Sequence, residues 1–239
     1  MADYKIALTA GHYKGTPGKR CLKALDSKET REWVLNDRIA DKVEKLLKSY
    51  EGYSLIRTDD TTGEKNISIN ARTNAANNFK ADIYLSLHHN AGIKGGKGGG
   101  IMAYTYTNVN ERTKKLQKAF YDSLIKHTGL KGNRSDPLAK ANFAECRLTK
   151  MSAVLLELGF MDSKTDVPII LTEAYADNCA KAIVEVLVAD GKLTKKQVAT
   201  ETNVGSKLYR VQVGAYSVKA NAEAMQKKLK AAGFDATIV

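Results

Sequence analysis

The chain has little cysteine, and this scarcity limits its chemistry. Cys21, Cys146 and Cys179 are the whole set among 239 residues, and no two of them form a CxxC pair. An odd number without that spacing indicates neither a disulfide framework nor a thiolate metal site, so we expect reduced thiols. The chain also lacks an apolar run long enough to span a membrane, and we do not expect it to be membrane-embedded. Its 43% apolar content predicts instead a globular protein with one sizeable domain and a smaller part.

A secretory signal is also missing. The first residues, MADYKIALTAGH, enter a strand-like run directly, without the basic, apolar and small-residue regions of a signal peptide. We therefore expect a protein made in the cytoplasm. A substrate outside the membrane would then require another route, such as lysis of the producing cell.

Acidic residues are outnumbered, since 38 Lys and Arg face 26 Asp and Glu and give a net charge of +12. This surplus favours polyanionic partners such as nucleic acid, teichoic acids or an anionic envelope. The lysines are scattered and no basic motif is interleaved with aromatics, so we expect no nucleic-acid binding. The glycine-rich stretch GIKGGKGGG lacks Walker A order and precedes a strand, which favours a flexible loop over a phosphate site.

Strand-like runs alternate with helical patterns, which indicates βαβ units, a largely parallel sheet and the α/β fold class. The strand-like runs are 5–10, 53–58, 81–88, 100–106 and 153–160. Apolar stripes at helical spacing, which should face the sheet, lie within 30–48, 116–124 and 176–187. The polar stretch at 191–206 is typical of a linker, so we expect one domain over 1–190 and a second segment over 207–239.

Four residues stand where an apolar strand or helix gives way to polar sequence: His12, Glu32, His88 and Glu157. Three of them occupy strand-end positions, and the carboxyl ends of strands in α/β sheets converge on one edge. Glu32 continues an apolar helical stripe to the helix N-terminus, where a carboxylate would face that edge. Glu157 lies inside VLLELGF, where an acid must face a cavity or be paired, because an isolated buried carboxylate is costly.

Each of these residues also has an ordinary structural explanation. A histidine after a strand is often a hydrogen-bonded loop residue, and Glu32 is a favourable charge at the helix dipole. His89 competes with His88, but consecutive strand residues point to opposite faces, so one of the two can share a site. Glu29 competes with Glu32, yet Asp26 and Glu29 have capping-box spacing, which predicts that Glu29 caps the helix.

Two imidazoles and one carboxylate would leave a zinc ion with net positive charge and one open position, as catalytic sites require. Zinc lowers the pKa of a bound water from about 16 towards about 7 and polarises a carbonyl oxygen. A carboxylate just outside the ligands can take the water's proton and pass it to the leaving amine, and Glu157 fits that role. The residues therefore suggest a zinc hydrolase.

The segments around these residues resemble zinc-dependent N-acetylmuramoyl-L-alanine amidases of the type 3 family, common among bacterial autolysins and phage endolysins. In the family's order, over about 1–188, the matching stretches are TAGH, ETREWVLNDRIADKV, RTNAANNFKADIYLSLHHNA and AVLLELGFMD. The resemblance implies a twisted six-stranded sheet flanked by helices, Zn²⁺ ligation by His12, Glu32 and His88, and Glu157 as the catalytic glutamate. One departure is GHYKGTPGKR, which lacks the extra Gly and Asp that many members carry after the first ligand.

The same resemblance implies that the substrate is peptidoglycan and that the amide between N-acetylmuramic acid and L-alanine is hydrolysed, causing lysis of the cell wall. A zinc peptidase that cuts within the stem peptide is an alternative, because the metal chemistry serves any amide. A wall-binding protein without catalysis is a third, although pure binding needs no catalytic acid. The residues do not distinguish a phage endolysin released through a holin from an autolysin acting at mother-cell lysis.

Residues 208–239 are predicted to form a strand, an amphipathic helix and a strand, a small βαβ-like segment whose helical stripe is Ala222, Met225, Leu229 and Ala232. They resemble the opening half of a sporulation-related (SPOR) repeat, a module that binds glycan strands lacking stem peptides. Gln212 and Gly214 match its strand motif, which implies a role in glycan binding. Without a second half, the segment would expose unpaired edges unless it self-associates or the chain is longer. A folded stub that binds nothing is the other alternative.

Overall fold

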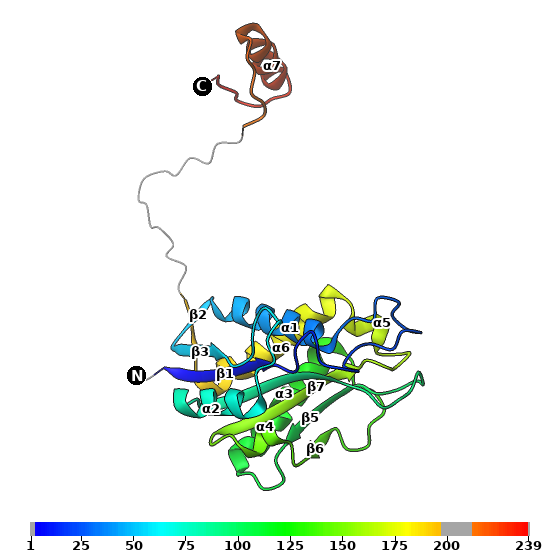
Figure 1. Cartoon of the computed structure of the whole chain (residues 1–239). Helices are drawn as coiled ribbons and strands as arrows, with labels where there is room; N and C mark the ends of the chain where they lie inside the picture. Colours follow the sequence, from blue (N-terminus) through cyan, green and yellow to red (C-terminus); the bar gives the residue numbers. More distant parts are fainter. Residues whose placement is uncertain (1–2, 197–211, 239) are drawn as a thin grey trace. The chain divides into compact units, whose positions relative to one another are not determined.

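The computed structural model of the chain describes residues 3–196 and 212–238, which fall into two compact units divided at Lys196 (Figure 1). The elements of the first unit, in chain order, are β1 (Tyr4–Ala10), α1 (Glu32–Leu47), β2 (Tyr50–Glu51), β3 (Tyr53–Arg57), α2 (Ile69–Phe79), β4 (Ile83–Asn90), β5 (Ile101–Thr105), α3 (Glu111–Thr128), β6 (Leu138–Lys140), α4 (Ala144–Arg147), β7 (Ser152–Phe160), α5 (Val167–Ile170), α6 (Glu173–Gly191) and β8 (Thr194–Lys195).

Six strands form the central sheet in the order β3-β1-β4-β7-β5-β6. β5 runs antiparallel to β7, and every other pair of neighbours is parallel. The predicted α/β class with a mostly parallel six-stranded sheet is therefore confirmed. All five predicted strands are present, whereas β2, β6 and β8 are too short to show a periodicity in sequence.

Helices cover both faces of this sheet (Figure 1). On the first face, α6 packs against both α1 and α3 over the larger apolar cluster. α2 and α4 contact each other on the second face, over a smaller cluster that includes Leu155. Side chains alternate along β4, so Leu85 and Leu87 join the larger cluster while Ser86 and His88 point to α4. One strand thus supplies both core and polar site residues.

The start of α1 differs from the prediction. The helix begins at Glu32, and the residue before it makes no side-chain cap. Asp26 instead accepts two backbone N–H groups from the next four residues, which closes a turn before the helix begins. Glu29 has a left-handed backbone with φ of +48° and pairs with Arg20. The expected capping by Glu29 is therefore wrong, because the carboxylate lies in the turn and not on the helix.

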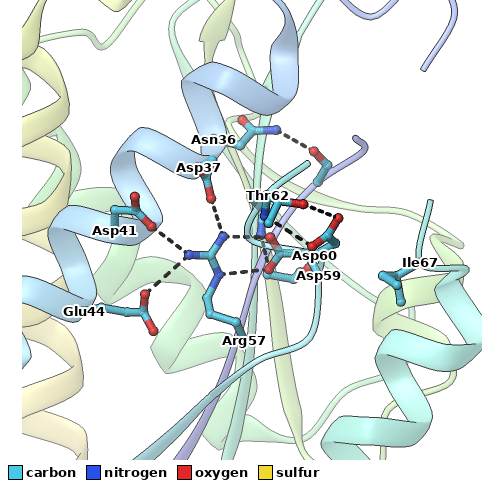
Figure 2. A network of polar contacts seen from close by, with 12 residues as sticks. Asn36, Asp37, Asp41, Glu44, Arg57, Asp59, Asp60, Thr62 and Ile67 are labelled. Carbon is cyan, nitrogen blue, oxygen red and sulfur yellow. Dashed lines mark hydrogen bonds and ion pairs between the residues drawn. The ribbon is translucent and has the colours of Figure 1, made fainter. Parts of the chain in front are cut away.

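A buried arginine joins β3 to α1 and to the end of β1 (Figure 2). Arg57 contacts Asp59 at two points, at 2.9 and 2.7 Å, and such bidentate pairs fix geometry. Asp59 also accepts the backbone N–H of Ala10 at 3.1 Å, two residues before His12. Around the same guanidinium lie three carboxylates of α1, those of Asp37, Asp41 and Glu44. The network fixes the backbone from which His12 projects.

The first unit extends past the boundary predicted at residue 190. α6 continues to Gly191, and β8 pairs antiparallel with β2. The predicted linker is therefore wrong over residues 191–196, because a two-residue pairing without apolar periodicity leaves no sequence signal. Residues 197–206, the rest of that prediction, lie outside the described residues.

In the second unit, the described residues contain one helix, α7 (Lys219–Ala231). Its predicted stripe is largely present, since Ala222, Met225 and Leu229 are half-buried, although Ala232 is exposed. The described residues on either side of α7 form no strand, so the expected strand–helix–strand arrangement is wrong over them. A strand needs a neighbour for its ladder hydrogen bonds, and these flanks have none within the described part of the chain. Residues 208–211 lie outside it.

The three cysteines are buried and free. Among the described residues, no helix has the length and apolar character that a membrane crossing requires.

Candidate metal centre

The carboxyl edge of the sheet brings the four predicted site residues together. His12 follows β1, Glu32 begins α1, His88 lies in β4 and Glu157 lies in β7. The register of the parallel pair β4 and β7 sets His88 directly beside Glu157. One nitrogen or oxygen from each of His12, Glu32 and His88 lies within 4.8 Å of the others. Residues separated by up to 145 positions therefore share one site.

Glu32 lies between the two histidines. Its Oε2 atom is 3.3 Å from Nε2 of His12, and its Oε1 atom is 3.1 Å from Nδ1 of His88. Ligand atoms held about 2.0–2.1 Å from a tetrahedral zinc ion lie roughly 3.3 Å from one another, and the separation of Glu32 Oε2 from His12 Nε2 matches this value. Glu32 Oε2 is buried and makes no hydrogen bond within the described residues, and Lys19 Nζ lies 3.7 Å from it. The donor set and this buried oxygen fit a zinc ion.

Burial and the two imidazoles act on Glu32 in opposite directions. Burial raises the pKa of its carboxyl group, but the contacts with His12 and His88 outweigh burial and hold the pKa well below its usual range. The side chain is therefore an anion at neutral pH, which is the form that ligates metals.

The backbone of His12 is held in an uncommon conformation. Its φ of +67° lies in the left-handed region, where a residue with a side chain needs support from its surroundings. Arg72 of α2 gives that support by donating to the carbonyl oxygens of Ala10 and His12, each at 2.6 Å, and to Oγ1 of Thr9 at 2.9 Å. A buried cation thus fixes the end of β1 and the direction in which the His12 ring leaves it.

His88 and His89 point to opposite faces, as consecutive strand residues do. The ring of His89 lies under α1, with Nδ1 2.8 Å from Oδ1 of Asn36. Burial lowers the pKa of His89 to about 3, so this ring stays neutral. The backbone N–H of His89 donates to Oε1 of Glu32 at 3.1 Å. His89 therefore supports the Glu32 carboxylate through its backbone, while its ring belongs to the core.

Glu157 lies beside the three candidate ligands. It is partly buried, and its Oε2 atom has no hydrogen-bond partner in the described part of the chain. Burial is the main cause that raises the pKa of its carboxyl group to about 7, against the opposing effect of His88. A carboxyl group that titrates near neutral pH can both accept and return a proton, as general acid–base catalysis requires.

A cavity of about 530 Å³ opens over these groups, a size typical of ligand sites. His12, His88 and Glu157 line it, together with the apolar side chains of Pro17, Ile67, Ile69, Phe143 and Leu155. A substrate can therefore approach the candidate ligands from solvent along an apolar wall.

Glu145 also belongs to this site, and the sequence patterns did not identify it. It is buried in α4, its Oε2 atom accepts a hydrogen bond from Oγ of Ser86 at 2.6 Å, and the same atom lies 3.3 Å from Nε2 of His88. Burial raises the pKa of the Glu145 carboxyl, but His88 and Ser86 outweigh it and hold the pKa at about 2. The available signal was an acid between Ala144 and Cys146, the same kind of anomaly that marks Glu157.

Comparison with known proteins agrees with this geometry. Residues 6–189 match the family model for N-acetylmuramoyl-L-alanine amidase, and residues 191–239 match the SPOR domain. A sporulation-specific N-acetylmuramoyl-L-alanine amidase of Bacillus subtilis (strain 168) is 32% identical over 238 residues, which cover 98% of this chain and 84% of that protein. The endolysin of Bacillus phage SPP1 is 30% identical over 193 residues, covering 80% of this chain and 67% of that protein.

A solved structure has the same fold. The N-acetylmuramoyl-L-alanine amidase from Clostridium difficile 630 superposes with a TM-score of 0.70 at 24% identity, over 79% of this chain and 97% of that one. At this identity the likeness establishes the architecture alone.

Proposed function

This chain belongs to the N-acetylmuramoyl-L-alanine amidase family, and from that premise we propose that it hydrolyses the amide between N-acetylmuramic acid and L-alanine with one zinc ion held by His12, Glu32 and His88. The observation that carries the proposal is the Glu32 carboxylate, buried between two imidazole nitrogens at 3.1 and 3.3 Å, with Lys19 Nζ 3.7 Å from one of its oxygens. The substrate is peptidoglycan, so the enzyme acts on the bacterial cell wall.

The protein's own groups divide the chemistry between them. When bound, zinc supplies a Lewis acid for the amide carbonyl and lowers the pKa of a water molecule. Glu157 takes a proton from the attacking water, because its carboxyl group titrates near neutral pH and its Oε2 atom has no other partner in the described residues. Glu157 then returns that proton to the nitrogen of L-alanine as the amine leaves.

The zinc assignment is tested by elemental analysis together with activity. His12→Ala and His88→Ala should each lose zinc and turnover in parallel, because each removes one of three ligands. His127→Ala is the matched control, since His127 pairs with Glu185 on α6 and contributes nothing to the site. Full zinc occupancy in both site variants would contradict the metal centre.

The bond that is cut is identified from the new ends in digested cell walls. An amidase frees the lactyl carboxyl group of the sugar and the amine of L-alanine, and mass spectrometry detects both. New ends within the stem peptide would instead indicate a peptidase built on the same metal chemistry.

The C-terminal unit has a separate proposed role. Its SPOR match supports glycan binding by 207–239, and Gln212 and Gly214 are the proposed glycan contacts. Both residues are exposed, and Nε2 of Gln212 donates to the Gly214 carbonyl at 3.4 Å. Large apolar side chains of this unit are also exposed, namely Val213, Tyr216, Val218, Phe234 and Ile238. Self-association would cover them, and sedimentation of the full chain over a range of concentrations measures it.

A further inference from the structure

The two ring nitrogens of His88 face two different carboxylates. Nδ1 lies 3.1 Å from Oε1 of Glu32, and Nε2 lies 3.3 Å from Oε2 of Glu145. Glu32 is also the carboxylate that meets His12, so Nδ1 is the atom that points to the candidate metal position. Nε2, on the far side of the ring, points away from that position and towards α4.

A neutral imidazole carries one proton, and it ligates a metal through the nitrogen that lacks it. Ligation through Nδ1 of His88 therefore requires the proton on Nε2, and a buried N–H there requires an acceptor. We propose that Glu145 is that acceptor: a positioning residue that holds the Nε2–H tautomer of His88 and aims Nδ1 at the zinc ion. The inference rests on the zinc site of the proposed function.

Glu145 is itself held in place for this contact. Ser86 and His88 are two residues apart on β4, so both side chains leave the same face of the strand. The Ser86 hydroxyl donates to Oε2 of Glu145 at 2.6 Å, and the same oxygen faces His88. Only 6% of the Glu145 surface is exposed. Burying its carboxylate would cost free energy without hydrogen-bond partners, and Ser86 and His88 are those partners.

The His88 ring also packs against backbone, that of Gly11. A Cβ atom added to Gly11 would lie 2.1 to 2.4 Å from three atoms of the ring, so the ring packs directly on that glycine. Gly11 therefore limits how far the ring can tilt, and Glu145 determines which nitrogen carries the proton. Carboxylates that accept the second N–H of a metal-bound histidine act in this way, and their loss weakens metal binding about 10- to 100-fold.

The experiment measures zinc affinity by competition with a chromophoric chelator in the full-length chain. Glu145→Ala should bind zinc about 10- to 100-fold more weakly than the parent. Glu145→Gln keeps the volume and an oxygen acceptor but not the charge, so its zinc affinity should lie between those of the parent and Glu145→Ala. It also serves as the control for a folding defect in the alanine variant. Glu185→Ala removes a carboxylate that lies 2.7 Å from Nε2 of His127, and it should leave zinc affinity unchanged.

A second readout follows the Nε2–H group of His88 directly. In ¹H–¹⁵N spectra of the zinc-loaded parent, this N–H should show the downfield shift and slow exchange of a hydrogen-bonded group, and zinc-loaded Glu145→Ala should lose both. Parental affinity and parental His88 signals in Glu145→Ala would overturn the inference. So would a large loss of turnover with unchanged zinc affinity, which would give Glu145 a chemical role instead.

Failure of the zinc site itself is recognised separately. If the parent binds no zinc, or if His12→Ala binds it as tightly as the parent does, the proposed function fails and the role of Glu145 fails with it. If His12→Ala loses zinc while Glu145→Ala keeps it, only the role of Glu145 is overturned.

Discussion

At the scale of single residues, the proposed chemistry depends on Glu157, whose Oε2 atom has no hydrogen-bond partner in the described residues. Glu157→Gln preserves the shape of this side chain but cannot accept a proton. We expect it to keep zinc and wall affinity and to lose about 100- to 10,000-fold in turnover, the usual contribution of general acid–base catalysis. Turnover is measured on cell walls, with the exposed Glu111→Gln as control. Activity within a few-fold of the parent would remove Glu157 from the mechanism.

Gly11 matters to the site because it has no side chain. Gly11→Ala would place a methyl group against the His88 ring, at distances that real contacts do not reach, and should displace the ring and strip the zinc. Gly18→Ala, in the same loop, is the control. Gly18 has φ of +72° but no atom within 4 Å of an added Cβ, so the variant should lose about 1–2 kcal/mol of stability and keep its zinc. Zinc content and thermal unfolding of both variants separate the two effects, and a zinc-loaded Gly11→Ala would show that the ring is not confined.

Sequence patterns identified those site residues that interrupt a long periodic element. His12, His88 and Glu157 end or break apolar runs, and Glu32 extends a helical stripe, so each contrasts with its neighbours. Glu145 has the same anomaly, but α4 is four residues long and provides no periodic background against which an acid stands out. Its partner, His88, is 57 residues away, and only the folded sheet brings them together.

At the scale of elements, the junction of β3 and α1 contains more negative than positive charge, with four carboxylates around Arg57 (Figure 2). Burial, aided by Asp41 and Asp59, raises the pKa of Asp37 to about 6 from an ordinary value of 3.8, although Arg57 opposes the rise. Between these two values the unfolded chain loses the proton while the folded chain keeps it. The contribution of Asp37 to the free energy of unfolding is therefore greatest below pH 4, falls as pH rises to about 6, and is constant above that.

Asp37→Asn tests this dependence because it removes the titrating group and keeps the shape. Urea unfolding of the parent and the variant at half-unit steps from pH 4 to pH 7 gives the difference in free energy of unfolding. Taking this difference cancels the titration of groups that both proteins share, including Glu157. We expect the parent to lose stability relative to the variant as pH rises to about 6, with no further change above it. A difference independent of pH, or one that grows with pH, would show that Asp37 is ionised throughout.

The elements differ in how well sequence predicts them, and length is the reason. Strands of five or more residues and the helices α1, α3 and α6 repeat their apolar pattern often enough to be recognised. β2, β6 and β8 have two or three residues and depend on partners distant in sequence. The strands expected on either side of α7 have the right composition, but pairing is non-local, and composition alone does not supply a neighbour.

At the scale of the whole molecule, the net charge of +12 and the SPOR match are two separate proposed sources of wall attraction. Attraction between the basic surface and an anionic wall is screened by salt, with a Debye length of about 8 Å at physiological ionic strength. Binding of glycan by a folded module depends on specific contacts and is screened much less. Salt therefore distinguishes the two contributions in one assay.

Truncation after Lys196 is the change that separates targeting from catalysis, because all four site residues and the β2–β8 pair lie before that point. We expect the truncated chain to keep its zinc and to cleave a soluble muramoyl-peptide at the parental rate. It should bind intact walls more weakly, since a second contact raises the effective concentration of enzyme on the wall without altering the chemistry. The deficit in wall binding should persist at high salt, where the charge contribution is screened. A truncation after Asp190 serves as the comparison for the boundary, because it also removes β8 and should unfold at lower temperature than the first truncation. Loss of soluble-substrate cleavage after truncation at Lys196, or unchanged wall binding at every salt concentration, would mean that the C-terminal unit is not an independent targeting module.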